Sequence, residues 1–158
     1  MFGLPLGGPP AKPLKICPEN FDDRTNLCWV DKPFVSKDGS RLGYVSMQEK
    51  DLPDWVAYKM IQMQLTPKGT IASLTAELRK DCDINKVASS VAARFGKPTE
   101  DHLQPQEILK TATWELKDIF IHMTLAGSHC SVSFRTPEDI AAQRAYWESK
   151  KVNRPATP

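Results

Sequence analysis

Four cysteines are the residues of this chain whose spacing most clearly predicts chemistry: Cys17, Cys28, Cys82 and Cys130. Zinc sites and thioredoxin-type redox sites use cysteines in short C-x-x-C pairs, and no two of these cysteines stand that close. An even number of well-separated cysteines is typical of disulfide-bonded proteins from oxidising compartments. We therefore expect two disulfides, with buried free thiols as the alternative.

The sequence around the cysteines favours one of the three possible pairings. Cys17 and Cys28 flank a polar stretch that has little else to order it. Cys82 directly precedes a predicted helix, and Cys130 falls on the apolar side of a predicted strand. The expected pairs are Cys17–Cys28 and Cys82–Cys130, which would stabilise the fold by about 3 and about 4 kcal/mol through the entropy of the unfolded chain.

Three histidines are the candidates for acid–base or metal chemistry. His102 lies in a polar stretch, while His122 and His129 lie on predicted strands, where they approach each other if the register allows. Neighbours on a strand point to opposite faces, so His129 and Cys130 cannot form a nucleophile–base pair. No third ligand is spaced to complete a metal site. We expect surface histidines and assign no catalytic, metal-binding or cofactor-binding residue.

Other patterns of catalysis are equally weak. The paired carboxylates fit turns, helix caps and the first turns of helices. No G-x-S-x-G nucleophile elbow occurs in the chain. The sequence therefore leans away from an enzyme without excluding one.

Alternating apolar and polar residues predict the strands that must position these groups. Two hairpins are expected over 33–47 and 56–78, and the second turns at 66–69, where a proline and a glycine suit a tight reversal. A three-stranded meander is expected over 112–134, and the polar stretch 99–110 before it is predicted to be a loop. Consecutive hairpins imply an antiparallel sheet.

Two helices are predicted, at about 83–95 and 137–151. The first has an unbroken apolar stripe, with Asp83 as its N-cap and Gly96 at its end. The second begins with Thr136 as the N-cap, followed by a proline and two acidic residues. The fold class is therefore α+β: an antiparallel sheet built from hairpins and a three-stranded meander, with both helices packed on it.

The chain divides into three regions by this reading. Residues 1–32 form a proline-rich arm that a disulfide fastens, 33–151 form a single α+β domain, and 152–158 form a C-terminal tail that frays. A chain of 158 residues is long enough to bury a core without help.

Charge and hydropathy argue against several classes of function. The chain has 21 basic and 19 acidic residues, and they are interspersed, so the basic stripe of a nucleic-acid-binding domain is not expected. No run of about 18 apolar residues predicts a membrane span. The sequence opens without the regions of a signal peptide, which fits either a cytoplasmic protein or the mature form of an exported one. The cysteines favour the exported form.

Aromatic residues are the remaining candidates for binding. Trp29 follows Cys28 and Trp55 lies in a predicted loop, where each either anchors a partner or caps the sheet locally. The last predicted helix is apolar on nearly all sides, which exceeds what packing on one sheet face requires. We therefore expect one side of this helix to pack on the sheet while Tyr146 or Trp147 contacts another protein, which can be a second copy of this chain.

A looser pattern connects several of these features. It combines the opening Phe2-Gly3-Leu4, the early Cys17 and Cys28, a helix that ends in Phe95-Gly96-Lys97-Pro98-Thr99, and the strand of Trp114 that follows. The pattern resembles small exported bacterial proteins of unknown function. The resemblance implies a location in the cell envelope, periplasmic or secreted, and supplies neither an activity nor site residues.

The leading prediction is a periplasmic or secreted protein-interaction module: a binder, an inhibitor or an accessory factor. One alternative is a small-ligand-binding domain with a pocket between the sheet and the helices. Another is a hydrolase with dispersed catalytic residues. No cofactor is expected, and the expected partner is another protein rather than a nucleic acid or a membrane.

Overall fold

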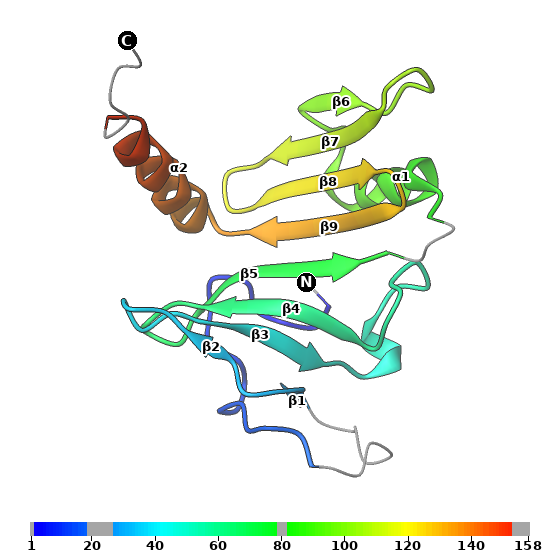
Figure 1. Ribbon diagram of the computed structural model, residues 1–158. Helices are drawn as coiled ribbons and strands as arrows, with labels where there is room; N and C mark the ends of the chain where they lie inside the picture. Colours follow the sequence, from blue (N-terminus) through cyan, green and yellow to red (C-terminus); the bar gives the residue numbers. More distant parts are fainter. Residues whose placement is uncertain (1, 19–26, 79–81, 153–158) are drawn as a thin grey trace.

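The computed structural model describes residues 2–18, 27–78 and 82–152, and Figure 1 shows their arrangement. Within these residues, two α-helices accompany nine strands, and the strands pair antiparallel in one sheet. The strand order is β1-β3-β4-β5-β9-β8-β7-β6, and β2 also pairs with β3. The predicted α+β fold class is confirmed. Of the tail predicted at 152–158, Val152 is the last residue of the second helix, and residues 153–158 lie outside the described residues.

The elements have the following bounds. The strands are β1 (Cys28–Trp29), β2 (Phe34–Val35), β3 (Arg41–Ser46), β4 (Met60–Leu65), β5 (Ile71–Glu77), β6 (Glu100–His102), β7 (Leu109–Glu115), β8 (Phe120–Ala126) and β9 (His129–Arg135). The helices are α1 (Ile84–Phe95) and α2 (Pro137–Val152).

The strands arise where the alternation predicts them, with two exceptions, β1 and β6. The strand β1 lies inside residues 1–32, which were predicted to be a proline-rich arm, so the arm of the structure is residues 2–18. The hairpins β2–β3 and β4–β5 and the meander β7–β8–β9 all form. The stretch predicted as a loop at 99–110 instead contains the edge strand β6, in which Glu100 pairs with Thr113. All three residues of β6 are exposed, so the strand has no apolar alternation. Its pairing rests on the backbone, and hydrophobic spacing could not reveal it.

The sheet contains a repeated arrangement of strands. The strands β3–β4–β5 form one meander, β7–β8–β9 form another, and each meander is followed by a helix. They meet at the antiparallel pair β5–β9, where Thr75 lies opposite Ser133. A twofold rotation about an axis through the β5–β9 pair would bring the strand order β3–β4–β5 onto β7–β8–β9. The two helices, however, do not take equivalent positions (Figure 1).

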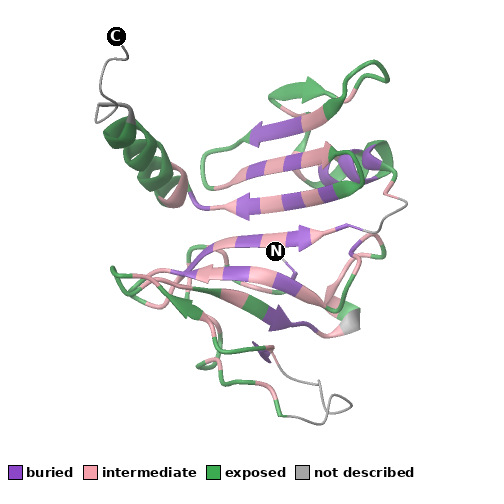
Figure 2. Ribbon diagram, in the orientation of Figure 1, coloured by how far each residue is buried: buried purple, intermediate pink, exposed green. Residues whose placement is uncertain are grey.

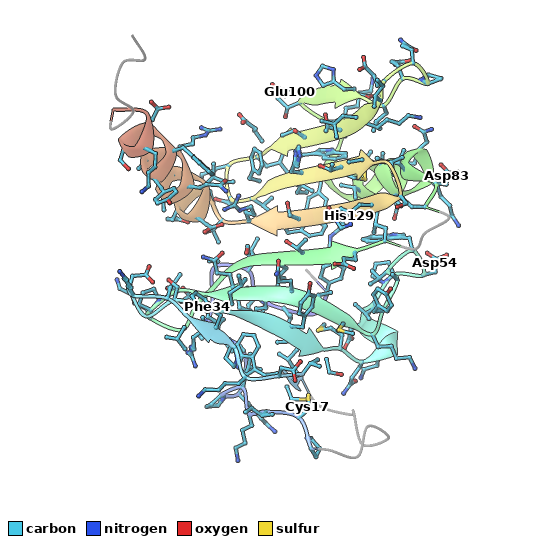
Figure 3. The ribbon with its side chains drawn as sticks, viewed as in Figure 1. Cys17, Phe34, Asp54, Asp83, Glu100 and His129 are labelled. Atoms are coloured by element: carbon cyan, nitrogen blue, oxygen red, sulfur yellow. A yellow bond between two sulfur atoms is a disulfide. The ribbon has the colours of Figure 1, made fainter. Side chains whose placement is uncertain are left out.

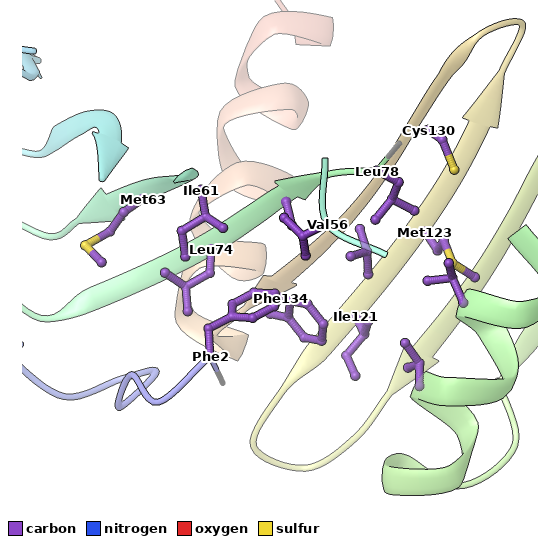
Figure 4. Packing of buried hydrophobic residues seen from close by; sticks show 14 of the residues in the cluster. Phe2, Val56, Ile61, Met63, Leu74, Leu78, Ile121, Met123, Cys130 and Phe134 are labelled. Carbon is purple, nitrogen blue, oxygen red and sulfur yellow. The ribbon is translucent and has the colours of Figure 1, made fainter. Parts of the chain in front are cut away.

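One face of the sheet carries the core, which α1 and the N-terminal arm cover together. Phe134 of β9 lies at their meeting point: its ring is 5.5 Å from that of Phe2 in the arm and 6.4 Å from that of Phe95 in α1. Figure 4 shows this packing, with Phe2 and Phe134 beside Leu74 and Ile121. The helix is also tied to the sheet through Trp114, whose indole N–H donates to the Gly96 carbonyl over 2.8 Å.

Helix α2 leaves the sheet instead of folding beneath it. Residues 78–83 separate β5 from α1, whereas Thr136 alone separates β9 from α2. A connection of one residue is shorter than the strand-to-helix loops that let a helix turn back onto its sheet. The face behind β3–β5, which α2 would cover by analogy with α1, is occupied by the apolar residues of the arm. The sequence predicts both helices correctly, but only α1 lies along a sheet face; α2 contacts the sheet at its first turns.

Both predicted disulfides form. The Cα atoms of Cys17 and Cys28 are 5.1 Å apart, and those of Cys82 and Cys130 are 6.5 Å apart. Both distances lie within the range that disulfides span, about 4.4–6.8 Å. No cysteine is left as a free thiol, so the alternative of buried thiols does not hold. The first bond ties the far end of the arm to β1, and the second ties the segment before α1 to β9.

Candidate functional site

Helix α2 is anchored to the sheet by a small group of polar contacts near its start. Thr136 is the N-cap, and its hydroxyl accepts a hydrogen bond from the Asp139 N–H over 3.2 Å. The Arg135 guanidinium donates to the Asp139 carboxylate and to the Gln143 side chain, both over 2.6 Å. One turn further along, Arg144 and Glu115 of β7 form an ion pair of 3.2 Å. These contacts fix the direction in which the helix leaves the sheet.

Residues 141–150 of α2 are exposed on all sides of the helix. Every residue from 141 to 150 is exposed, and Figure 2 shows this part of the helix in a single colour. The side chains of Tyr146 and Trp147 are 54% and 58% exposed, and their rings meet edge to face at 5.5 Å. Large aromatic rings that stay half in water on a helix are unusual for a monomer surface and frequent in interfaces. The structure therefore places both predicted residues on an accessible surface.

The two other tryptophans proposed as partner anchors lie elsewhere. Trp29 is 2% exposed, and a Cβ built on Gly43 would lie only 3.2 Å from its ring. Gly43 is thus the residue that leaves room for this ring, and Trp29 belongs to the core rather than to a partner surface. Trp55 is half-buried, and its ring lies 6.3 Å from that of Phe2, which agrees with local packing.

The sheet face opposite the core is polar and carries His122. The imidazole is half-buried and lies between two threonine hydroxyls, with Nδ1 3.1 Å from Thr113 Oγ1 and Nε2 2.9 Å from Thr124 Oγ1. Burial of the ring lowers the pKa of His122, and the positive charge of Arg135 lowers it further. Ser133 lies opposite His122 in the register, but its hydroxyl donates to the backbone carbonyl of His122 and not to the ring. The pair is therefore not arranged as a nucleophile and its base.

The three histidines are not brought together. His129 lies opposite Ala126 at one end of the β8–β9 ladder. His122 lies opposite Ser133, towards the other end of the same ladder. His102 lies on the edge strand β6 and is exposed. Figure 3 shows the side chains of the sheet, with Glu100 and His129 on separate strands. Among the described residues, no group of three or more His, Cys, Asp or Glu side chains is placed to hold a metal ion.

A cavity of about 900 Å³, partly open to solvent, lies between the N-terminal arm, the start of β1 and the segment that follows β3. Its walls come from the arm and from the segment after β3, including Phe2, Leu14 and Met47. A ligand pocket was expected between the sheet and the helices, so this cavity lies in a different place. In the sequence, only the apolar residues of the arm pointed to this cavity. The same residues also fit an arm that simply packs on the domain surface, so they could not predict a cavity.

Comparison of the chain with protein-family models, with curated proteins and with solved structures finds no match. In the described part of the chain, neither helix has the length and apolar character that crossing a membrane requires.

Proposed function

We propose that this protein is an extracytoplasmic protein-interaction module and that α2 is the element through which it binds. The observation that carries the proposal is the exposure of residues 141–150 on a helix that the sheet holds at one end. Helices that dock on other proteins present an anchored, accessible face of this kind. The location rests on the two disulfides, which persist in oxidising compartments such as the periplasm or the exterior of the cell.

The partner that the chemistry of the helix favours is a second copy of the same helix. The exposed face includes three alanines, which allow two helix backbones to approach closely: Ala141, Ala142 and Ala145. Tyr146 stands beside them, and Lys150 lies over its ring at 5.5 Å. A surface of small residues beside an aromatic ring can bury apolar area without gaps when it packs on a copy of itself.

The charges along the helix specify the direction of the pairing. The first turn is acidic, with Glu138 exposed, and the last turns are basic, with Lys150 exposed. Two copies that pack antiparallel place Glu138 of one helix near Lys150 of the other. Parallel copies would place like charges together. Opposite charges at an interface rim favour the antiparallel arrangement and speed the encounter of the two copies.

Sedimentation velocity of the purified protein tests this proposal. We expect the wild-type protein to form a dimer in the micromolar range and Tyr146→Glu to be a monomer, because the new charge would be buried between two helices. Tyr58→Glu is the matched control, since Tyr58 is 53% exposed and lies away from α2. It should leave the dimer unchanged.

A charge exchange tests the direction of pairing in the same experiment. Glu138→Lys alone should weaken the dimer, and Glu138→Lys combined with Lys150→Glu should restore it. A wild-type protein that stays monomeric throughout, or a Tyr146→Glu variant that dimerises as well as the wild type, would overturn the proposal.

A further inference from the structure

The N-terminal arm is fastened to the sheet at two points and spans the cavity between them. Near its start, the Gly7 N–H donates to the Ile71 carbonyl, and the Ile71 N–H donates to the Gly8 carbonyl, both over 2.8 Å. Further on, the Cys17 N–H donates to the Trp29 carbonyl and the Trp29 N–H to the Lys15 carbonyl, again over 2.8 Å. The Cys17–Cys28 disulfide closes the second fastening.

The segment between the two fastenings is stiff. It contains Pro9, Pro10 and Pro13, whose rings fix the backbone angle φ and remove backbone donors. A segment of this kind does not collapse into the space beneath it, so it can hold a cavity open before any ligand arrives. Such preorganisation lowers the entropic cost of binding.

The lining of the cavity is mainly apolar. Phe2 and Met47 are 5% and 4% exposed to solvent, and Leu4, Leu14 and Leu27 are partly buried around them. The volume of about 900 Å³ falls in the range of small-molecule sites, about 300–1,000 Å³. The cavity can therefore take an apolar chain or ring that would otherwise be exposed to water.

The charged groups of the lining lie on the two sides of this apolar surface. Lys12 and Lys15 come from the arm and are exposed to solvent, while Asp51 comes from the segment after β3. Two positive groups against one negative group leave a net charge of +1 in the lining. Flexible lysine side chains at an open rim are suited to a single anionic head group.

From this arrangement we infer that the cavity binds a small amphipathic anion: a molecule with one apolar chain, which lies on Leu4, Leu14 and Leu27, and one acidic head, which Lys12 and Lys15 hold. This site is independent of α2 and adds a ligand to the interaction function proposed above.

Titration calorimetry with dodecanoate, below the concentration at which it forms micelles, tests the site. We expect saturable binding of one molecule per chain and weaker binding of dodecyltrimethylammonium, which has the same chain with a positive head. The double variant Lys12→Glu/Lys15→Glu should bind dodecanoate about tenfold more weakly. Lys37→Glu/Lys68→Glu, which reverses two exposed lysines in hairpin turns, is the matched control and should bind as the wild type does.

A second variant separates loss of the site from loss of the fold. Ala11 lines the cavity and is exposed, so Ala11→Trp adds a large ring there without disturbing the core; it should abolish dodecanoate binding while the thermal unfolding midpoint stays unchanged. Equal binding of the anionic and cationic ligands would overturn the inference. So would binding to anionic lipid vesicles in the absence of any binding to monomeric dodecanoate.

Discussion

At the scale of single residues, His122 is an ionisable group whose pKa the folded environment shifts. The sequence predicts that it shares a face with Phe120 and Thr124, and the structure agrees. The sequence could not give its partners across the strands, because Thr113 and Ser133 meet it only through the register of β7, β8 and β9. Residues far apart in the chain create this environment, and no local pattern encodes it.

The lowered pKa of His122 makes the stability of the fold depend on pH. Its pKa lies below the ordinary value of 6.5 in the folded protein, first because of burial and then because of Arg135. Below pH 6.5 the unfolded chain therefore binds the proton more readily than the folded chain does. This contribution to stability is complete above pH 6.5 and is lost as the pH falls towards the folded pKa.

Urea unfolding between about pH 7 and about pH 5 measures this effect. The wild-type free energy of unfolding should fall as the pH is lowered, and His122→Gln should flatten the slope while keeping an amide between the two threonines. His129→Gln is the control, because His129 is exposed and should leave the slope as it is. Equal slopes in all three proteins would refute the role assigned to His122.

At the scale of elements, the two helices show what hydrophobic spacing can and cannot predict. Both are found at the expected positions, because caps and helix-forming residues are local signals. The stripe of α1 also predicts its buried side, which includes Ile84, Val87 and Val91. The position of α2 could not be predicted in this way, since it depends on the one-residue connection at Thr136 and on an arm that comes from the other end of the chain.

A pair of proline substitutions measures how differently the two helices support the fold. Ser90→Pro in α1 and Ala145→Pro in α2 both replace an exposed residue in the middle of a helix. Ser90→Pro should lower the free energy of unfolding by about 3 kcal/mol or more, because α1 covers the core. Ala145→Pro should lower it by less than Ser90→Pro does, because the contacts of the turns that it disrupts, those of Gln143 with Arg135 and of Arg144 with Glu115, are exposed and lie outside the core.

Equilibrium urea unfolding provides the free energies, and far-ultraviolet circular dichroism checks the helix content. Equal losses of unfolding free energy for Ala145→Pro and Ser90→Pro would contradict the statement that α2 lies outside the core. The comparison should be made at a protein concentration below that of dimer formation.

At the scale of the whole molecule, the disulfides and the arm hold distant parts of the chain together. The spacing and the neighbours of the cysteines were enough to predict both pairs, because Cys17 and Cys28 flank a polar stretch that needs ordering and Cys82 and Cys130 lie at a predicted helix and a predicted strand. The cavity beneath the arm could not be predicted, because it depends on the two points at which the arm pairs with Ile71 and Trp29. Such contacts follow from the assembled sheet rather than from any segment of it.

Removal of each disulfide in turn tests its share of the stability. The variant Cys17→Ala/Cys28→Ala should lose about 3 kcal/mol and Cys82→Ala/Cys130→Ala about 4 kcal/mol, because the second bond closes a longer loop, with a separation of 48 residues against 11. Urea unfolding measures both losses. Peptide mapping of the alkylated wild-type protein by mass spectrometry should find no free thiol, and four free thiols in natively isolated protein would exclude both bonds.

The two outer edges of the sheet bear on whether the chain can form fibres. At one edge, the arm pairs with β1 through Ile16 and Trp29, and the strand β2 beside it is only the two residues Phe34–Val35. At the other, β6 is only Glu100–His102, and two of its residues are acidic. Short or charged edges resist the addition of a further strand. Copies of this protein should therefore not stack into a continuous cross-β assembly, even at concentrations at which open sheets begin to polymerise.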